Sequence, residues 1–89
     1  MLLYKSILLT LRKRERIIHT TISYKKLWNI LLDRDMKKKD LQEAAGLTGY
    51  GMLKLSRDEN VTTEVLGKIC LALNCTTDEI MEFIPESED

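Results

Sequence analysis

The feature that most constrains this chain is the segment at residues 37–60, which reads as two short helices joined by a sharp turn. The first helix carries apolar side chains at helical spacing, on Leu41, Ala44 and Ala45. It then meets Gly46, a residue type that can leave a helix through a left-handed conformation without steric cost. A stop signal therefore stands where a tight turn is needed.

The second helix of this segment begins after Thr48, whose hydroxyl is suited to cap it. Met52 and Leu55 stand three residues apart, so we expect both to face the core. Tyr50 and Lys54 lie elsewhere on the same helix. Two helices, one tight turn and a polar outer face are typical of a helix-turn-helix.

The segment resembles the helix-turn-helix of the lambda-repressor/Cro-like (Xre) family of regulators. Five positions match the family pattern in register: Gly46, Leu47, Thr48, Met52 and Leu55. The similarity continues into residues 59–75, which look like the loop and fourth helix of that family, and it covers about residues 22–83. The resemblance implies an all-α, five-helix domain that binds double-stranded DNA and regulates transcription, with a homodimer as the expected form.

The cleanest periodicity predicts the first helix of this domain at residues 24–35, with Ser23 as its N-cap. Its apolar stripe is expected to be buried and consists of Tyr24, Leu27, Trp28, Leu31 and Leu32. The next two helices are those of the motif, predicted at residues 37–45 and 49–57. These elements place the motif against a preceding amphipathic helix.

A fourth helix is predicted at residues 63–73, followed by Asn74 as a left-handed C-cap. Its inward residues are Val65, Leu66, Ile69, Cys70 and Leu73. Thr76 and Glu79 then stand three residues apart as a capping box, which launches a short fifth helix. We expect that helix to run through Ile80, Met81, Phe83 and Ile84 until Pro85 ends it, and the residues after Pro85 to be frayed.

Length and composition indicate one small domain. The chain has 89 residues, of which 44% are hydrophobic and 31% charged. Such a chain is near the size at which a single core is just sufficient, and its composition suits a compact helical domain. We divide it into an N-terminal arm at 1–22, a helix-turn-helix domain at 23–84 and an acidic tail at 85–89.

The arm at 1–22 does not fit the five-helix plan. Its first part has a helical stripe on Tyr4, Ile7, Leu8 and Leu11, whereas residues 17–22 are rich in β-branched side chains and favour an extended strand. A β-hairpin between 7–11 and 17–22 is a further alternative, although the connection lacks the Gly or Asn that short hairpins favour.

Three roles for the arm are open: dimerisation, a basic arm on DNA, or an extension of little importance. We favour dimerisation, because so much exposed apolar surface would be a liability on a monomer.

Charge is distributed unevenly along the chain. Residues 1–57 hold 13 Lys and Arg against 5 Asp and Glu, a net charge of +8, while residues 58–89 hold 1 against 9, a net charge of −8. Charge runs are often only solvated faces. Here the basic half coincides with the motif, which favours a polyanionic partner such as DNA.

Family resemblance gives each DNA-binding candidate a role. The candidates are Lys37, Lys38, Lys39, Thr48, Gly49, Tyr50, Lys54, Arg57 and Asn60. In the family, the helix that begins at residue 49 enters the major groove, so Gly49, Tyr50 and Lys54 are expected to face the groove. Lys54 would donate to guanine or neutralise a phosphate, and Tyr50 would stack, bind a phosphate or pack on the core edge.

The other candidates are expected near the DNA backbone. Thr48 caps the groove helix where its N–H groups can also point at phosphate, and Lys38 opens the preceding helix near phosphate. Lys37, Lys39 and Asn60 are backbone-contact candidates, although the lysines also suit a solvated helix start and Asn60 also suits a loop role.

Two departures from the family pattern concern the geometry of the motif. Gly49 and Gly51 stand where the family usually carries polar reading residues, and each Gly costs a helix about 0.5–1 kcal/mol relative to Ala. Base-specific readout is therefore expected to be thin. Gln42 replaces the small Ala usual where the two helices cross, which allows a different crossing or a polar contact there.

The main alternative function is a protein-interaction module, such as an antitoxin-like or regulator-binding partner. An enzyme is disfavoured, because His19 is the only histidine and neither Cys70 nor Cys75 has a base beside it in the sequence. The two thiols also lack the other ligands that a zinc site needs, so we expect no metal or cofactor and no small-molecule ligand. No apolar run reaches the length of a membrane span, and we expect a cytoplasmic protein.

Overall fold

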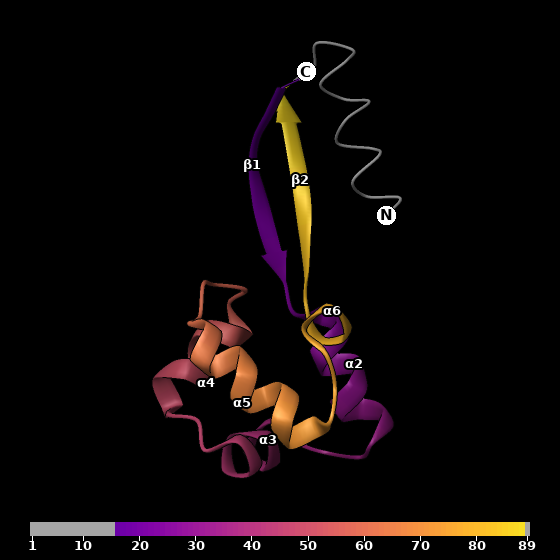
Figure 1. Cartoon of the computed structure of the whole chain (residues 1–89), viewed down its shortest axis with the longest axis vertical. Coiled ribbons are helices and arrows are strands. Elements are labelled where there is room, and N and C mark those ends of the chain that lie inside the picture. Colours follow the sequence, from indigo (N-terminus) through magenta and orange to yellow (C-terminus); the bar gives the residue numbers. More distant parts are fainter. Residues whose placement is uncertain (1–15, 89) are drawn as a thin grey trace.

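The structure, a computed structural model, describes residues 16–88. Five helices and two strands follow one another as β1 (Arg16–Ser23), α2 (Lys25–Asp33), α3 (Lys38–Ala45), α4 (Gly49–Ser56), α5 (Thr63–Leu73), α6 (Thr77–Ile80) and β2 (Glu82–Glu88). The helices form one body, from which the two strands stand out as a ribbon (Figure 1). The predicted five-helix domain is confirmed, and the sheet is an addition to it. The apolar stripe and hairpin strand expected before residue 12 lie outside the described residues.

Helix α2 begins one residue later than the sequence indicated. Tyr24 is the N-cap, and the Ser23 hydroxyl accepts a hydrogen bond from the backbone N–H of Lys25 at 3.3 Å. Leu27 and Leu31 are buried as expected, but Leu32 is 78% exposed. The expected stripe was too wide, because Leu32 lies about 100° around the helix from Leu31.

The turn between α3 and α4 has the predicted geometry. Gly46 ends α3 in the left-handed region with φ 65° and ψ 40°. The backbone N–H of Leu47 then donates to the carbonyl of Gln42 at 2.9 Å, which satisfies the end of the helix. Thr48 caps α4, with its hydroxyl accepting from the backbone N–H of Gly51 at 3.0 Å. Of the three residues expected on the apolar side of α3, Leu41 and Ala45 are buried, whereas Ala44 is exposed.

Helix α5 follows its predicted bounds and ends as predicted at Asn74, whose φ is 55°. The backbone N–H of Cys75 donates to the carbonyl of Cys70 at 3.0 Å, and Cys75 packs, partly buried, against the core. Within residues 16–88 the two cysteines are free thiols, and no group of metal-ligating side chains occurs. Nor does that part of the chain contain a helix long and apolar enough to cross a membrane.

The expectation for the C-terminus was wrong. The capping box is present, with the Glu79 carboxylate accepting from the backbone N–H of Thr76 at 2.9 Å, but α6 stops at Ile80. Phe83 and Ile84 continue in β2 instead of the helix. Two forces oppose a longer helix: a residue before proline is disfavoured in the helical region, and β1 offers a full row of backbone partners.

The ribbon is an antiparallel pair in which Ser23 lies opposite Glu82 and Ile22 lies opposite Phe83. Residues 86–88, which we expected to be frayed, pair with β1 near its start, with an irregularity between Ile17 and His19. Pro85 is tolerated because both strands are edges of a two-stranded sheet. The extended reading of residues 17–22 is therefore confirmed, and its partner among the described residues is the C-terminal strand.

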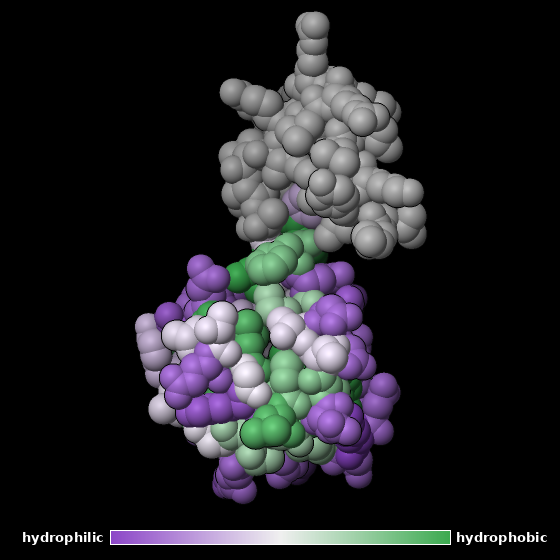
Figure 2. All heavy atoms as spheres, viewed as in Figure 1, coloured by the Kyte–Doolittle hydropathy of each residue, from purple (hydrophilic) through white to green (hydrophobic). Residues whose placement is uncertain are grey.

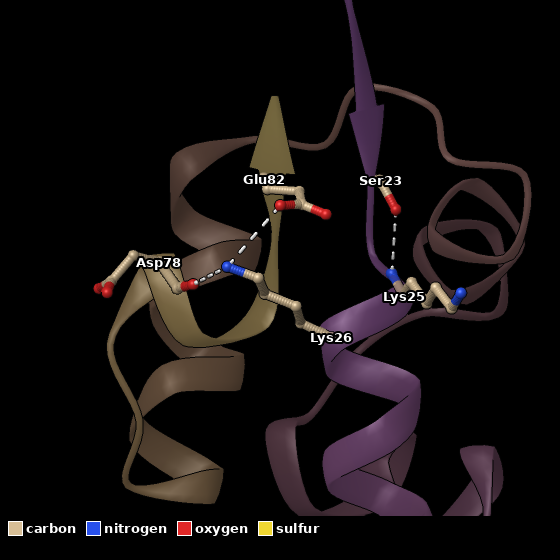
Figure 3. Close-up of polar contacts among 5 residues, drawn as sticks. All are labelled: Ser23, Lys25, Lys26, Asp78 and Glu82. Atoms are coloured by element: carbon tan, nitrogen blue, oxygen red, sulfur yellow. Dashed lines mark hydrogen bonds and ion pairs between the residues drawn. The ribbon is translucent and has the colours of Figure 1, made fainter. Parts of the chain in front are cut away.

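Lys26 joins the base of the ribbon to the helical body (Figure 3). Its ammonium group donates to the backbone carbonyl of Asp78 at 3.1 Å and lies 3.9 Å from the Glu82 carboxylate. These contacts connect α2 with the end of α6 and the start of β2. Hydrophobic residues also gather where the ribbon meets the helices, bordered by hydrophilic ones (Figure 2).

Every helix contributes to one hydrophobic core. Its buried members are Tyr24, Leu27, Leu31, Leu41, Ala45, Leu47, Met52, Leu55, Ile69, Leu73, Ile80 and Met81. Met52 and Leu55 are thus buried as the motif predicts. Gln42, which we expected where the two motif helices cross, is half-buried in α3, and its side chain makes no hydrogen bond within the described part of the chain.

Replacing Ile69 with Ala tests the central place of α5 in this core. Ile69 is fully buried, so Ile69→Ala is expected to lower the free energy of unfolding by about 2–5 kcal/mol in urea denaturation. Leu71→Ala is the matched control, since Leu71 lies on the same helix but is 86% exposed, and its effect should stay within about 0.5 kcal/mol. Equal losses in both variants would contradict this description of the core.

Candidate nucleic-acid interface

The exit of α4 is tied to the start of α2 through Tyr24. The Tyr24 hydroxyl donates to the backbone carbonyl of Glu59 at 2.8 Å, and its backbone N–H donates to the Asp58 carboxylate at 3.1 Å. Asp58 adopts a left-handed conformation with φ 55°, and the N–H of Glu59 donates to the carbonyl of Lys54 at 2.9 Å. These bonds fix the loop after α4, and with it the direction in which α4 points.

Helix α4 presents a mixed outer face. Its inner residues are in the core, while the Tyr50 side chain is 68% exposed, so packing on the core edge does not describe it. Lys54 follows Tyr50 by one helical turn, and its ammonium nitrogen lies 5.0 Å from the centre of the Tyr50 ring. At that distance a cation–π attraction holds the charged group beside the ring. Tyr50 and Lys54 therefore form one positively charged, aromatic unit.

A shallow hollow of about 340 Å³ lies between α4 and the start of α5. It is lined by Thr48, Tyr50, Gly51, Lys54, Asn60, Val61, Thr62 and Val65. Four of the nine predicted DNA-binding residues therefore meet around one feature, although they are up to twelve positions apart in the sequence.

The hollow also includes residues that sequence reasoning did not select. Val61 and Val65 supply apolar surface, and the Thr62 hydroxyl caps α5 by accepting from the N–H of Val65 at 3.2 Å. The capping pattern of Thr62 ahead of an amphipathic helix is the signal that would have located this wall.

Lys38 has a different environment from the other lysines at the start of α3. Its ammonium group donates to the Ser56 hydroxyl at 3.2 Å and lies 4.4 Å from the centre of the Trp28 ring. It therefore connects the start of α3 with the end of α4 and with α2. Lys37 and Lys39 are exposed, and within residues 16–88 their ammonium groups have no hydrogen-bond or ion-pair partner.

The remaining candidates lie at the two ends of α4. Arg57 is the C-cap of α4 and is exposed, one residue after Ser56, the partner of Lys38. Gly49 opens the helix and faces open space. The structure thus groups Thr48, Gly49, Tyr50, Lys54 and Asn60 around the hollow and the first turns of α4. It places Lys38 and Arg57 near the end of α4.

A model of the Cro/C1-type helix-turn-helix DNA-binding domain matches residues 26–86. The chain therefore belongs to the family of Cro/C1-type helix-turn-helix DNA-binding domains. It is also similar to a crystal structure of the transcriptional regulator VanUg, with 47% sequence identity, a TM-score of 0.73, and coverage of 76% of this chain and 91% of that one. No curated protein matches the chain closely enough to count as a relative.

Stability at high pH tests the position of Tyr24. Burial, and then the Asp58 carboxylate, raise the pKa of Tyr24 above its ordinary value of 10.0. Folding therefore favours the neutral hydroxyl. The stability that the neutral Tyr24 hydroxyl contributes is fully present below the unfolded pKa of about 10, and it is lost as pH rises through the higher folded pKa. In urea denaturation, the free energy of unfolding should fall above about pH 10 more steeply for the wild type than for Tyr24→Phe.

A comparison of wild type and Tyr24→Phe at neutral pH provides the control. At neutral pH the variant should be less stable than the wild type by about 1 kcal/mol, because it lacks the hydrogen bond to the Glu59 carbonyl. Stability curves that stay parallel from neutral pH to above pH 10 would contradict the assigned environment.

Proposed function

We propose that this chain regulates transcription by placing α4 in the major groove of duplex DNA. The observation that carries the proposal is the turn at Gly46 and Thr48, which buries one side of α4 and turns Tyr50 and Lys54 outward beside the hollow. In helix-turn-helix proteins the second helix reads the groove while the first crosses the backbone. The likeness to a transcriptional regulator supports the same role for this chain.

Each candidate residue then has a defined part. Tyr50 and Lys54 enter the groove as a unit, and Thr48 and Gly49 bring the start of α4 toward the DNA. Lys37, Lys39, Arg57 and Asn60 are exposed and suited to the phosphate backbone. Lys38 acts chiefly by positioning, since its ammonium group is held by Ser56 and Trp28.

Charge reversal at Lys54 tests the groove contact. Fluorescence anisotropy with a random duplex pool of roughly 30 base pairs, and with a duplex selected from that pool, reports affinity at about 50 and 200 mM salt. Lys54→Glu should weaken binding to the selected duplex by at least about tenfold and should reduce the salt dependence.

Lys68→Glu is the charge-matched control, because Lys68 lies on α5, does not line the hollow, and within residues 16–88 its ammonium group pairs only with the Glu64 carboxylate, at 3.6 Å. Its affinity should remain within about twofold of the wild type. Absence of any preference for the selected over the random duplex would refute sequence-specific regulation. Equal affinities of the wild type and Lys54→Glu would show that Lys54 does not contact the DNA.

We also propose that the protein acts as a homodimer whose contacts come from the arm at residues 1–22. A two-fold dimer would set the half-sites about 34–36 Å apart on DNA. The ribbon supports this idea, since Phe83 and Ile84 are 52% and 45% exposed beside β1. Such apolar surface is suited to a second copy.

A chain that begins at residue 16 tests the arm while keeping the whole of β1. Sedimentation should show a dimer for the full chain and a monomer for the shortened chain, with DNA affinity lost together with the dimer. A shortened chain that still dimerises would contradict a role of residues 1–15 and would place the interface on the ribbon, which that chain retains.

Protein interaction is the second candidate function. The observation that favours it is the exposed apolar surface of α4, where Tyr50 is accompanied by Leu53 at 44% exposure. Unchanged DNA affinity in Lys54→Glu, combined with loss of assembly on mutation of Leu8 or Ile18, would favour this function over DNA binding. In either case we propose a non-catalytic, cytoplasmic protein that carries reduced thiols and needs no cofactor.

A further inference from the structure

Two glycines flank Tyr50 at the start of α4. Gly49 and Gly51 both belong to the first turn of the helix, and Gly46 is the only glycine of the described chain with a positive φ. Gly49 and Gly51 therefore have a backbone conformation that any residue can adopt. Backbone conformation therefore does not explain why glycine occupies these two positions.

Packing does not explain these two glycines either. A Cβ atom at Gly49 would meet no atom within 4 Å, and one at Gly51 would meet only the Thr48 hydroxyl oxygen, at 3.4 Å, which is ordinary contact. Glycine is also one of the poorest helix formers, whereas alanine is the best. Alanine at both positions would therefore make the free protein more stable.

Location separates these glycines from Gly67. Gly67 lies within α5, is exposed, and also has no atom within 4 Å of an added Cβ. It does not line the hollow, whereas Gly51 does, together with Tyr50 and Lys54. A helical glycine without a structural reason therefore does not by itself indicate a binding site. The pair at Gly49 and Gly51 gains its meaning from its place on the proposed DNA-binding face.

We propose that the missing side chains at Gly49 and Gly51 let a DNA strand lie directly against the backbone of α4. Glycine is the residue type used where a backbone must approach a ligand closely. Tyr50 then projects from an otherwise smooth first turn, and a methyl group on either side of it would hold the helix away from the duplex. This inference rests on the proposed function and assigns the two glycines to it as contact positions.

The inference predicts opposite effects on the free and bound protein. Gly49→Ala and Gly51→Ala should each raise the melting temperature of the free protein by a few degrees, because alanine favours the helix. The same variants should weaken binding to both the selected duplex and the random pool by at least about fivefold, because the added methyl group prevents close approach. Gly67→Ala is the matched control: it should raise the melting temperature as well, with affinity within about twofold of the wild type.

Thermal denaturation and fluorescence anisotropy on the full-length proteins give both readouts. Alanine variants at 49 and 51 that are more stable and bind less than fivefold more weakly would overturn the inference, and so would a loss of affinity in Gly67→Ala as large as theirs. A lower melting temperature in either variant would show that the fold itself needs the glycine. Failure of the wild type to bind any duplex would refute the proposed function instead, so the two failures are distinguishable.

Discussion

The architecture depends on the hydrogen bonds that Tyr24 makes at the point where the ribbon enters the helical body. Tyr24 follows β1, is the N-cap of α2 and is only 1% exposed. From this position it holds Asp58 and Glu59, the first residues after α4 and its C-cap. A single residue, through its backbone N–H and its side-chain hydroxyl, therefore connects the strand, the core and the loop after α4. Because its hydroxyl is buried, its partner at Glu59 is worth more than the same bond would be in water.

Local signals predicted most of the helical body. The left-handed exit at Gly46, the cap at Thr48 and the left-handed end at Asn74 depend on residues within one turn of each other, so they can be seen in the sequence. The capping box at Thr76 was also local and correct. These features suffice for a five-helix fold because each one fixes where a helix begins or ends.

The C-terminal strand could not be predicted in the same way. Ile80, Met81, Phe83 and Ile84 have spacing that suits a helix, and nothing nearby reveals that Phe83 pairs with Ile22, some sixty positions earlier. Long-range pairing overrides local propensity where it satisfies a whole row of backbone groups.

The candidate interface could not be predicted from local sequence either, because it also depends on contacts between distant residues. Three adjacent lysines look equivalent in the sequence, yet only Lys38 meets Ser56 and Trp28, and the walls of the hollow converge from a loop and a separate helix.

A smooth, glycine-containing helix can contact DNA closely only if other groups hold it in position. Glycine contributes neither side-chain packing nor helix propensity, so the first turn of α4 depends on the Thr48 cap at its start. The far end is held by Lys38 on Ser56 and by the loop that Tyr24 fixes. Buried Met52 and Leu55 then set the rotation of the helix about its axis. Rigidity supplied from outside the helix therefore compensates for the side chains that Gly49 and Gly51 lack. In the DNA complex that we propose, the shape of the helix and the Tyr50–Lys54 unit are the means of recognition.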